Sequence, residues 1–153
     1  AAAAAAAAAA AFAAQAAGVL KPRAGGTPQL LGTELWSGEG SVTRASALHG
    51  ALFSAVSDNR YKRFVDSYEA RFGSQPYRIA TLGYDAVLLT LRVARDWRVG
   101  RDFPDRALRS EDGFLGLDGA FRFGPNGLVE RAFEVREVRD GAVVVVENAP
   151  ARF

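Results

Sequence analysis

The sequence predicts an α/β protein, because strand-like and helix-like segments alternate along its middle and a strand hairpin lies near its end. Strand-like runs at 29–32 and 51–56 are each followed by helical patterns. After Ser110 the hydrophobic period changes from that of a helix to that of a strand. The length of 153 residues, with 49% apolar and 24% charged residues, is typical of one ordinary globular domain.

Residues 1–17 are predicted to form one helix that ends at Gly18. Residues 1–14 are alanine apart from Phe12, and alanine favours a helix but gives it no packing face. This run is not expected to span a membrane, because alanine is only weakly hydrophobic and about 20 apolar residues are needed. No signal peptide is visible. Residues 21–27 contain proline and two glycines and are expected to form a loop.

Residues 29–32 predict a short buried strand that leads into a loop at 33–38. A weak helix is expected at 42–48, followed by a second strand at 51–56. His49, the only histidine, is expected in the loop before that strand as a surface or packing residue.

The next helix is the best specified. It is predicted to begin at the capping residues Ser57-Asp58-Asn59 and to end at Gly73, and Pro76 prevents its continuation. Its apolar and aromatic residues fall on one face at helical spacing. These are Tyr61, Phe64, Val65, Tyr68 and Phe72.

A longer helix is expected from Arg78 to Trp97, and a shorter one from Pro104 to Arg109. The polar residues of the longer helix share a narrow stripe. They are Thr81, Asp85, Arg92 and Asp96. Because most of the remaining circumference is apolar, this helix is predicted to be buried on more than one side.

The last part of the chain predicts strands separated by turns. Residues 120–123 alternate as a strand and end at the turn signal Pro125-Asn126-Gly127. The segments 131–138 and 142–147 flank Asp140-Gly141, which strongly favours a two-residue hairpin. Four consecutive valines in the last segment predict burial on both faces.

Composition argues against several classes of chemistry. The chain has no cysteine and one histidine, so no zinc site, thiol nucleophile, disulfide or serine–histidine triad is expected. The net charge of +2 arises from interspersed charges, which does not favour nucleic acid as a partner. Asp112 and Asp118 could form a paired-carboxylate site, but turn-forming roles explain both. We therefore expect no enzyme, no cofactor and no metal.

The order of these segments resembles the final third of type I periplasmic binding proteins, across residues 28–147. Five motifs carry the resemblance, weak singly but fairly specific in their order. They are Gly32-Thr33-Glu34, the strand Gly50–Ala55, the pattern F-x-x-x-Y-x-x-x-[FY]-G-x-x-P at 64–76, Tyr84-Asp85-Ala86-Val87, and the glycine-rich segment 116–127. The segments 31–36 and 116–123 look closest to the penicillin-binding protein activator (LpoA-like) branch. Receptors of branched-chain amino-acid transport are similar outside that branch.

The resemblance implies a type I periplasmic-binding-protein (Venus-flytrap) fold, of which this chain is a C-terminal portion that contributes to both lobes. Residues 28–56 and 119–147 would lie in one lobe, and residues 57–112 in the other. The chain would cross between the lobes near 54–57 and again at a group of hinge glycines. These are Gly113, Gly116 and Gly119.

The resemblance also singles out Glu34, because the carboxylate at this position in amino-acid receptors pairs with the ammonium group of the ligand. Thr33 and Trp36 are the other candidate ligand-binding residues. A solvated loop position is the alternative for Glu34, and packing onto the lobe is the favoured alternative for Trp36. Tyr84 and Asp85 are expected to be structural.

The function implied is a non-catalytic binding module of the periplasm or cell envelope, with a lipid anchor left open. It would close by a hinge around a molecule held in an interlobe cleft. Two types stay open. A penicillin-binding protein activator would bind a peptidoglycan synthase, whereas a solute-binding protein would take a small polar ligand such as leucine, isoleucine or valine to a permease. The arginines between 92 and 101 are either a solvated helix end or a docking patch.

Overall fold

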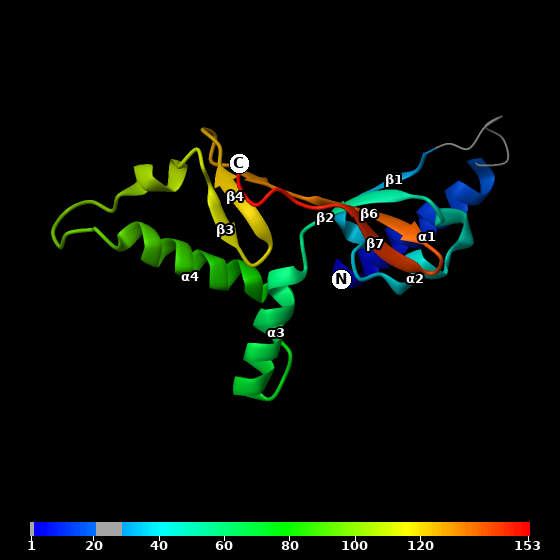
Figure 1. Ribbon diagram of the computed structural model, residues 1–153, viewed down its shortest axis with the longest axis horizontal. Coiled ribbons are helices and arrows are strands. Elements are labelled where there is room, and N and C mark those ends of the chain that lie inside the picture. Colours follow the sequence, from blue (N-terminus) through cyan, green and yellow to red (C-terminus); the bar gives the residue numbers. More distant parts are fainter. Residues whose placement is uncertain (1, 21–28) are drawn as a thin grey trace. The chain divides into compact units, whose positions relative to one another are not determined.

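The computed structural model describes residues 2–20 and 29–153. The loop expected at 21–27 lies outside these residues. Figure 1 shows helices and two separate sheets along the chain. This mixture confirms the predicted α/β class.

The chain divides into two compact units. Unit 1 contains the described residues up to Ala55 together with Glu134–Asn148, and unit 2 contains Val56–Phe133 and Ala149–Phe153. Each unit has a sheet of its own. Unit 1 is therefore assembled from segments that are far apart in the sequence.

Unit 1 is built on a four-stranded sheet with the order β1-β2-β6-β7. Its strands are β1 (Leu31–Gly32), β2 (Leu52–Ala55), β6 (Glu134–Arg139) and β7 (Ala142–Glu147). β1 and β2 are parallel, whereas β2, β6 and β7 pair antiparallel. The carboxyl ends of the two parallel strands therefore lie at the same end of the sheet.

The hairpin predicted at Asp140-Gly141 is confirmed. Asp140 has φ 51° and Gly141 has φ 77°, which is the left-handed backbone that this kind of two-residue turn needs. The strand before the turn begins at Glu134 rather than at residue 131. Arg131 belongs instead to β5 (Val129–Arg131) of unit 2.

Within residues 2–20 and 29–55, four helical segments accompany the sheet of unit 1. They are α1 (Ala2–Leu20), the 3-10 helices η2 (Glu34–Trp36) and η3 (Ser46–Leu48), and α2 (Gly40–Arg44). α1 continues through Gly18 to Leu20, so the predicted end at the glycine is wrong. The single helix expected at 42–48 is divided, because Ala45 has an extended backbone with φ −84° and ψ 102°.

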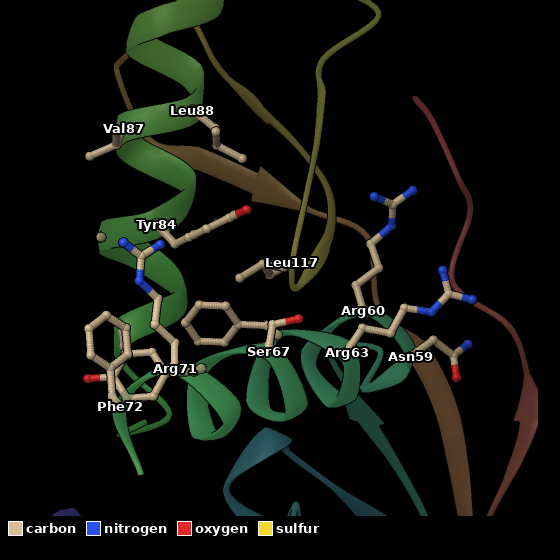
Figure 2. Close-up of a pocket in the computed structure, with 14 residues that line it drawn as sticks. Asn59, Arg60, Arg63, Ser67, Arg71, Phe72, Tyr84, Val87, Leu88 and Leu117 are labelled. Carbon is tan, nitrogen blue, oxygen red and sulfur yellow. The ribbon is translucent and has the colours of Figure 1, made fainter. Parts of the chain in front are cut away.

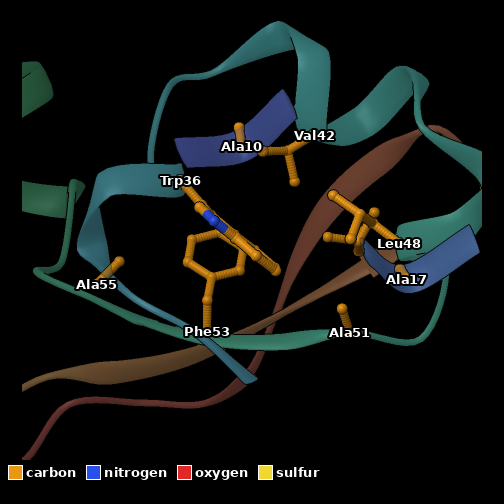
Figure 3. Packing of buried hydrophobic residues seen from close by; sticks show 9 residues of the cluster. Ala10, Ala17, Trp36, Val42, Leu48, Ala51, Phe53 and Ala55 are labelled. Atoms are coloured by element: carbon orange, nitrogen blue, oxygen red, sulfur yellow. The ribbon is translucent and has the colours of Figure 1, made fainter. Parts of the chain in front are cut away.

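The core of unit 1 includes the alanine-rich helix, contrary to the expectation that it offers no packing face. Ala10 and Ala17 are buried and lie seven residues apart, which places them on one face of α1. Their small side chains let the helix approach η2, η3 and α2 closely. Figure 3 shows this cluster. Its buried members are Ala10, Ala17, Trp36, Val42, Leu48, Ala51, Phe53, Ala55 and Val138.

The two edge strands of this sheet are less buried than the sequence predicts. Leu31 in β1 is 76% exposed, although its strand was expected to be buried. In β7, Val145 and Val146 are exposed and Val143 and Val144 only partly buried. Within the described residues each edge strand has a neighbour on one side only, so the prediction of burial on both faces is wrong for β7.

Unit 2 contains the helices α3 (Asn59–Phe72) and α4 (Ala80–Ala94) and the 3-10 helix η4 (Asp105–Arg109). α3 confirms the best-specified prediction, and Gly73 ends it with φ 72°. α4 is shorter than the predicted range. Its ends become turns, with Ala80 N–H donating to the Tyr77 carbonyl and Trp97 N–H donating to the Ala94 carbonyl.

The orientation of α4 is the reverse of the predicted one. Two residues of its polar stripe, Thr81 and Asp85, are buried. Most of the apolar residues that were expected to be covered are exposed, whereas Val93 is buried and Leu89 is partly buried. The helix thus buries one side rather than several, because its polar stripe faces the second sheet.

That second sheet is antiparallel with the order β3-β4-β5. β3 (Phe114–Gly116) and β4 (Gly119–Phe123) form a tight hairpin, and β5 pairs with the other side of β4. The turn signal before β5 is confirmed, because Gly127 N–H donates to the Gly124 carbonyl at 2.9 Å and Leu128 N–H donates to Asn126 Oδ1 at 3.1 Å.

The sheet changes the expected assignment of residues to the two parts. Residues 119–133 belong to unit 2, whereas the sequence grouped 119–147 with the first strands. Only 134–147 join those strands in unit 1. The reason is that β4 pairs with β3 on one side and with β5 on the other, so residues 119–131 belong to the sheet that begins at Phe114.

Candidate functional site

The candidate loop follows β1 in unit 1. β1 and β2 are parallel, with Leu31 opposite Leu52 and Gly32 opposite Phe53. Thr33 and Glu34 come directly after Gly32 and therefore lie at the carboxyl end of this strand pair. Ligands of open α/β sheets usually bind at this end.

Backbone hydrogen bonds fix the shape of this loop. Trp36 N–H donates to the Thr33 carbonyl at 3.0 Å, and Ser37 N–H donates to the Glu34 carbonyl at 2.9 Å. The loop is therefore a single 3-10 turn. These two hydrogen bonds involve backbone atoms only, so they do not depend on the exposed side chains of the loop.

A buried ion pair on β6 braces the end of the loop. Arg136 Nε donates to Glu134 Oε1 at 2.7 Å, and Arg136 Nη1 donates to Ser37 Oγ at 3.2 Å. Glu134 is 3% exposed and Arg136 is 7% exposed. Sequence reasoning missed this pair, although two side chains that are two residues apart on a strand lie on the same face of the sheet.

Trp36 belongs to the core of unit 1. Its ring is 5% exposed and lies 5.8 Å from the Phe53 ring. It also covers Gly32, where an added Cβ would lie 2.5 Å from the indole. This placement agrees with the packing interpretation, and the indole thus anchors the loop from below (Figure 3).

Three consecutive residues of the loop are exposed: Thr33, Glu34 and Leu35. Within residues 29–153 Glu34 has no ion-pair partner. A carboxylate in this state can accept charge-assisted hydrogen bonds from an added cation without first breaking an internal contact. Leu35 adds an apolar surface next to it.

The three glycines expected to form a hinge all lie inside unit 2. Gly113 precedes β3, and Gly116 and Gly119 flank the tight turn between β3 and β4. The chain passes between the units elsewhere, after Ala55 and after Phe133. The first passage agrees with the crossing expected near 54–57, and the second does not fall at the glycines. Gly116 and Gly119 pair across the hairpin turn, and a hinge role for the three glycines stays a prediction.

The turn of that hairpin is tied to α4 by buried polar groups. Asp118 accepts a hydrogen bond from Thr81 Oγ1 at 2.8 Å and pairs with Arg78. Asp85 accepts from Leu117 N–H with both carboxylate oxygens, at 2.9 and 3.0 Å. Asp118 thus has structural partners, which agrees with the turn-forming role expected for it, as Asp85 agrees with its expected structural role.

Burial raises the pKa of Asp85 above its usual value of 3.8. The Leu117 N–H opposes this effect, the charge of Asp118 adds to it, and Arg131 counteracts it more weakly. The folded protein therefore holds the Asp85 proton to a higher pH than the unfolded chain does.

This difference predicts a pH dependence of stability. A raised folded pKa stabilises the folded state below pH 3.8, and that contribution is lost as the pH rises through the folded pKa. We expect the stability of the protein relative to an Asp85→Asn variant to fall across this window and to stay constant above it. Urea unfolding from pH 3 upwards measures it, with the exposed Asp66→Asn as control. A constant difference would contradict the assignment.

Unit 2 also contains a groove of about 1050 Å³ between α3 and α4. Figure 2 shows side chains of both helices and Leu117 of the hairpin turn around it. The lining is largely apolar and aromatic, and its charged members are Arg60, Arg63 and Arg71. The sequence did not indicate this groove, because the apolar faces of both helices were read as ordinary core.

Two further properties bear on function. Within residues 2–20 and 29–153 no group of three or more histidine, aspartate or glutamate side chains could hold a metal ion. In the same part of the chain, no helix has the length and apolar character needed to cross a membrane.

No family model matches the chain, and no curated protein matches it. Solved structures do. A protein from Rhodospirillum rubrum described as a branched-chain amino acid ABC transporter is 24% identical with a TM-score of 0.64, over 84% of this chain and 39% of its own length. The leucine-binding protein LivK of Thermotoga maritima is 23% identical with a TM-score of 0.53, over 92% and 42%. LpoA of Haemophilus influenzae is 22% identical with a TM-score of 0.55, over 88% and 24%. The chain thus spans less than half of each.

Proposed function

We propose that this chain, which has the type I periplasmic-binding-protein (Venus-flytrap) fold, forms part of a non-catalytic binding module of the bacterial cell envelope. The observation that carries the proposal is the exposed carboxylate of Glu34 on a braced loop at the carboxyl end of two parallel strands. The same fold supports a location in the periplasm or cell envelope. Closure by a hinge and a lipid anchor stay predictions.

The loop supports binding because it is rigid and yet exposed. Trp36 anchors it in the core, and the Arg136–Ser37 hydrogen bond fixes its far end. Binding to a preorganised group avoids the cost of ordering it. Glu34 would accept hydrogen bonds from an ammonium group, and the hydroxyl of Thr33 would add a neutral one.

Two types of module fit this loop. In an activator of penicillin-binding proteins, Glu34 and the exposed Leu35 would contact a protein partner such as a peptidoglycan synthase. The exposed leucine would give such a contact an apolar part beside the charge of Glu34. In a solute-binding protein, Glu34 would pair with the α-ammonium of an amino acid for delivery to a permease. The 0.64 TM-score with the R. rubrum protein favours that alternative.

Glu34→Gln tests whether the carboxylate binds a cationic group. If an amino acid is the ligand, we expect its affinity to fall about ten- to hundredfold, because a hydrogen bond between charged groups becomes a neutral one. Isothermal titration calorimetry with leucine, isoleucine and valine measures this. Glu39→Gln removes the same charge five residues away and should leave the affinity unchanged. Equal affinities of the unsubstituted protein and of both variants would show that the Glu34 carboxylate does not bind the ligand.

A thermal-shift screen separates the two types. A rise of several degrees with one amino acid would rule out a purely protein-binding module. Retention of a peptidoglycan synthase by the immobilised protein, weakened by charge reversal of the arginines at 95, 98 and 101, would favour the activator type. The absence of both results would overturn the binding role of the loop.

A further inference from the structure

Helix α4 presents two different stripes. The buried stripe contains Thr81, Asp85 and Val93. A second stripe beside it follows the spacing i, i+3, i+4, i+7 and is apolar throughout. Its members and their exposed fractions are Tyr84 44%, Val87 60%, Leu88 49% and Leu91 62%. Such a stripe normally faces a protein interior.

The apolar stripe of α4 continues onto α3. The Phe64 ring lies 5.2 Å from the Tyr84 ring, and Tyr68 lies 4.5 Å from Phe72. Together with Leu117 these residues line the groove of about 1050 Å³ (Figure 2). The two helices therefore share one apolar face, which we call the α3–α4 face. A contiguous apolar surface of this kind indicates that further protein atoms pack against it.

The fold indicates what packs against this face. The R. rubrum structure matches 84% of this chain with a TM-score of 0.64, but the match covers only 39% of its own length. More than half of the same fold is therefore not represented in these 153 residues. Leu31 and Val145, on the edge strands of unit 1, are likewise apolar side chains that are exposed in the described residues.

We propose that the α3–α4 face is packed, in the protein as expressed from its own gene, by the part of this fold that lies outside the 153 residues, within the same polypeptide. The apolar stripe of α4 would then become the second buried side of that helix. The arginines at 60, 63 and 71 would remain at the rim of the contact, with their charged ends in water. The proposal is independent of what Glu34 binds.

Leu91→Lys tests it in the protein expressed from its own gene, with Thr90→Lys as the matched control on the same turn of α4. Thr90 is exposed and lies off the apolar stripe. We expect Leu91→Lys to lower the Tm by about 5 °C or more and Thr90→Lys to change it little. The protein should remain monomeric by light scattering. Equal Tm values for the two variants would overturn the proposal.

A second copy of the chain is the competing occupant of the face. In that case the unsubstituted protein would be a dimer whose Tm rises with concentration, and Leu91→Lys would make it monomeric. Either result would overturn packing within one polypeptide.

Thiol labelling gives an answer even if Leu91→Lys does not fold. The 153 residues contain no cysteine, so Leu91→Cys and Thr90→Cys each introduce a single thiol once any cysteine in the rest of the polypeptide is replaced by serine. We expect alkylation of the first to be about tenfold slower or more, because the covering part must open to admit the reagent. Equal rates would show that the face is open to solvent and would overturn the proposal.

Discussion

Replacing Trp36 with alanine is expected to lower the free energy of unfolding by about 3–5 kcal/mol, the range for removal of a large aromatic side chain from a packed core. The indole is 5% exposed, contacts Phe53 and covers Gly32. Gly32 is the last residue of β1, so the cavity would open directly beneath the candidate loop. We therefore expect the loss of stability to be accompanied by loss of binding at Glu34.

Urea unfolding followed by circular dichroism measures the first effect. Leu35→Ala is the matched control, because the neighbouring side chain is 54% exposed and its removal should cost about 0.5 kcal/mol or less. Trp97 is the other tryptophan and lies in unit 2. Its fluorescence reports on unit 2 in the variant. A loss below about 1 kcal/mol would show that Trp36 is not part of the core.

Gly116→Ala is expected to have the second largest effect. An added Cβ would lie 2.7 Å from Asp85 Cγ and closer still to Oδ2. Asp85 is short and buried, and it accepts the Leu117 N–H, so it cannot move aside without giving up that bond. Overpacking costs about 1–3 kcal/mol, and an unsatisfied buried N–H adds about 1–3 kcal/mol.

Gly83→Ala provides a control of opposite sign in the same unit. Gly83 lies within α4, and nothing lies within 4 Å of an added Cβ there. The substitution should stabilise the protein by about 0.5–1 kcal/mol, because alanine is favoured in a helix interior. Thermal unfolding of the two variants should therefore shift the Tm in opposite directions. Shifts of the same sign would contradict the close approach at Gly116.

Turns and helix ends that depend on neighbouring residues were predicted correctly from the sequence. Gly73 defined the end of α3, and Asp140-Gly141 defined the hairpin of β6 and β7. In each case the turn residue adopts the backbone that the motif requires. These features need no knowledge of what lies across the fold, and the sequence alone was sufficient for them.

The orientation of α4 could not be predicted in this way. Hydrophobic periodicity assumes that the apolar side is covered, but Thr81 and Asp85 contact the β3–β4 turn instead. A buried polar stripe is stable here because its groups have hydrogen-bond partners. The periodicity of one helix contains no information about those partners.

The candidate site was predicted in part. The resemblance placed Glu34 on a loop after a strand, and the structure has it exposed there. It did not reveal the brace, because the Arg136–Ser37 contact joins residues that are far apart in the sequence. The resemblance assigned the glycines at 113, 116 and 119 to a hinge between lobes, whereas the structure places all three within unit 2.

The interleaved order of the strands has a consequence for biosynthesis. Leu52 of β2 pairs with Glu137 of β6, and nearly all of unit 2 is encoded between them. At the usual rate of translation β2 leaves the ribosome on the order of ten seconds before its partner exists. Unit 2 can form during that interval, whereas unit 1 cannot. The unpaired edge of β2 is then the segment most in need of a chaperone.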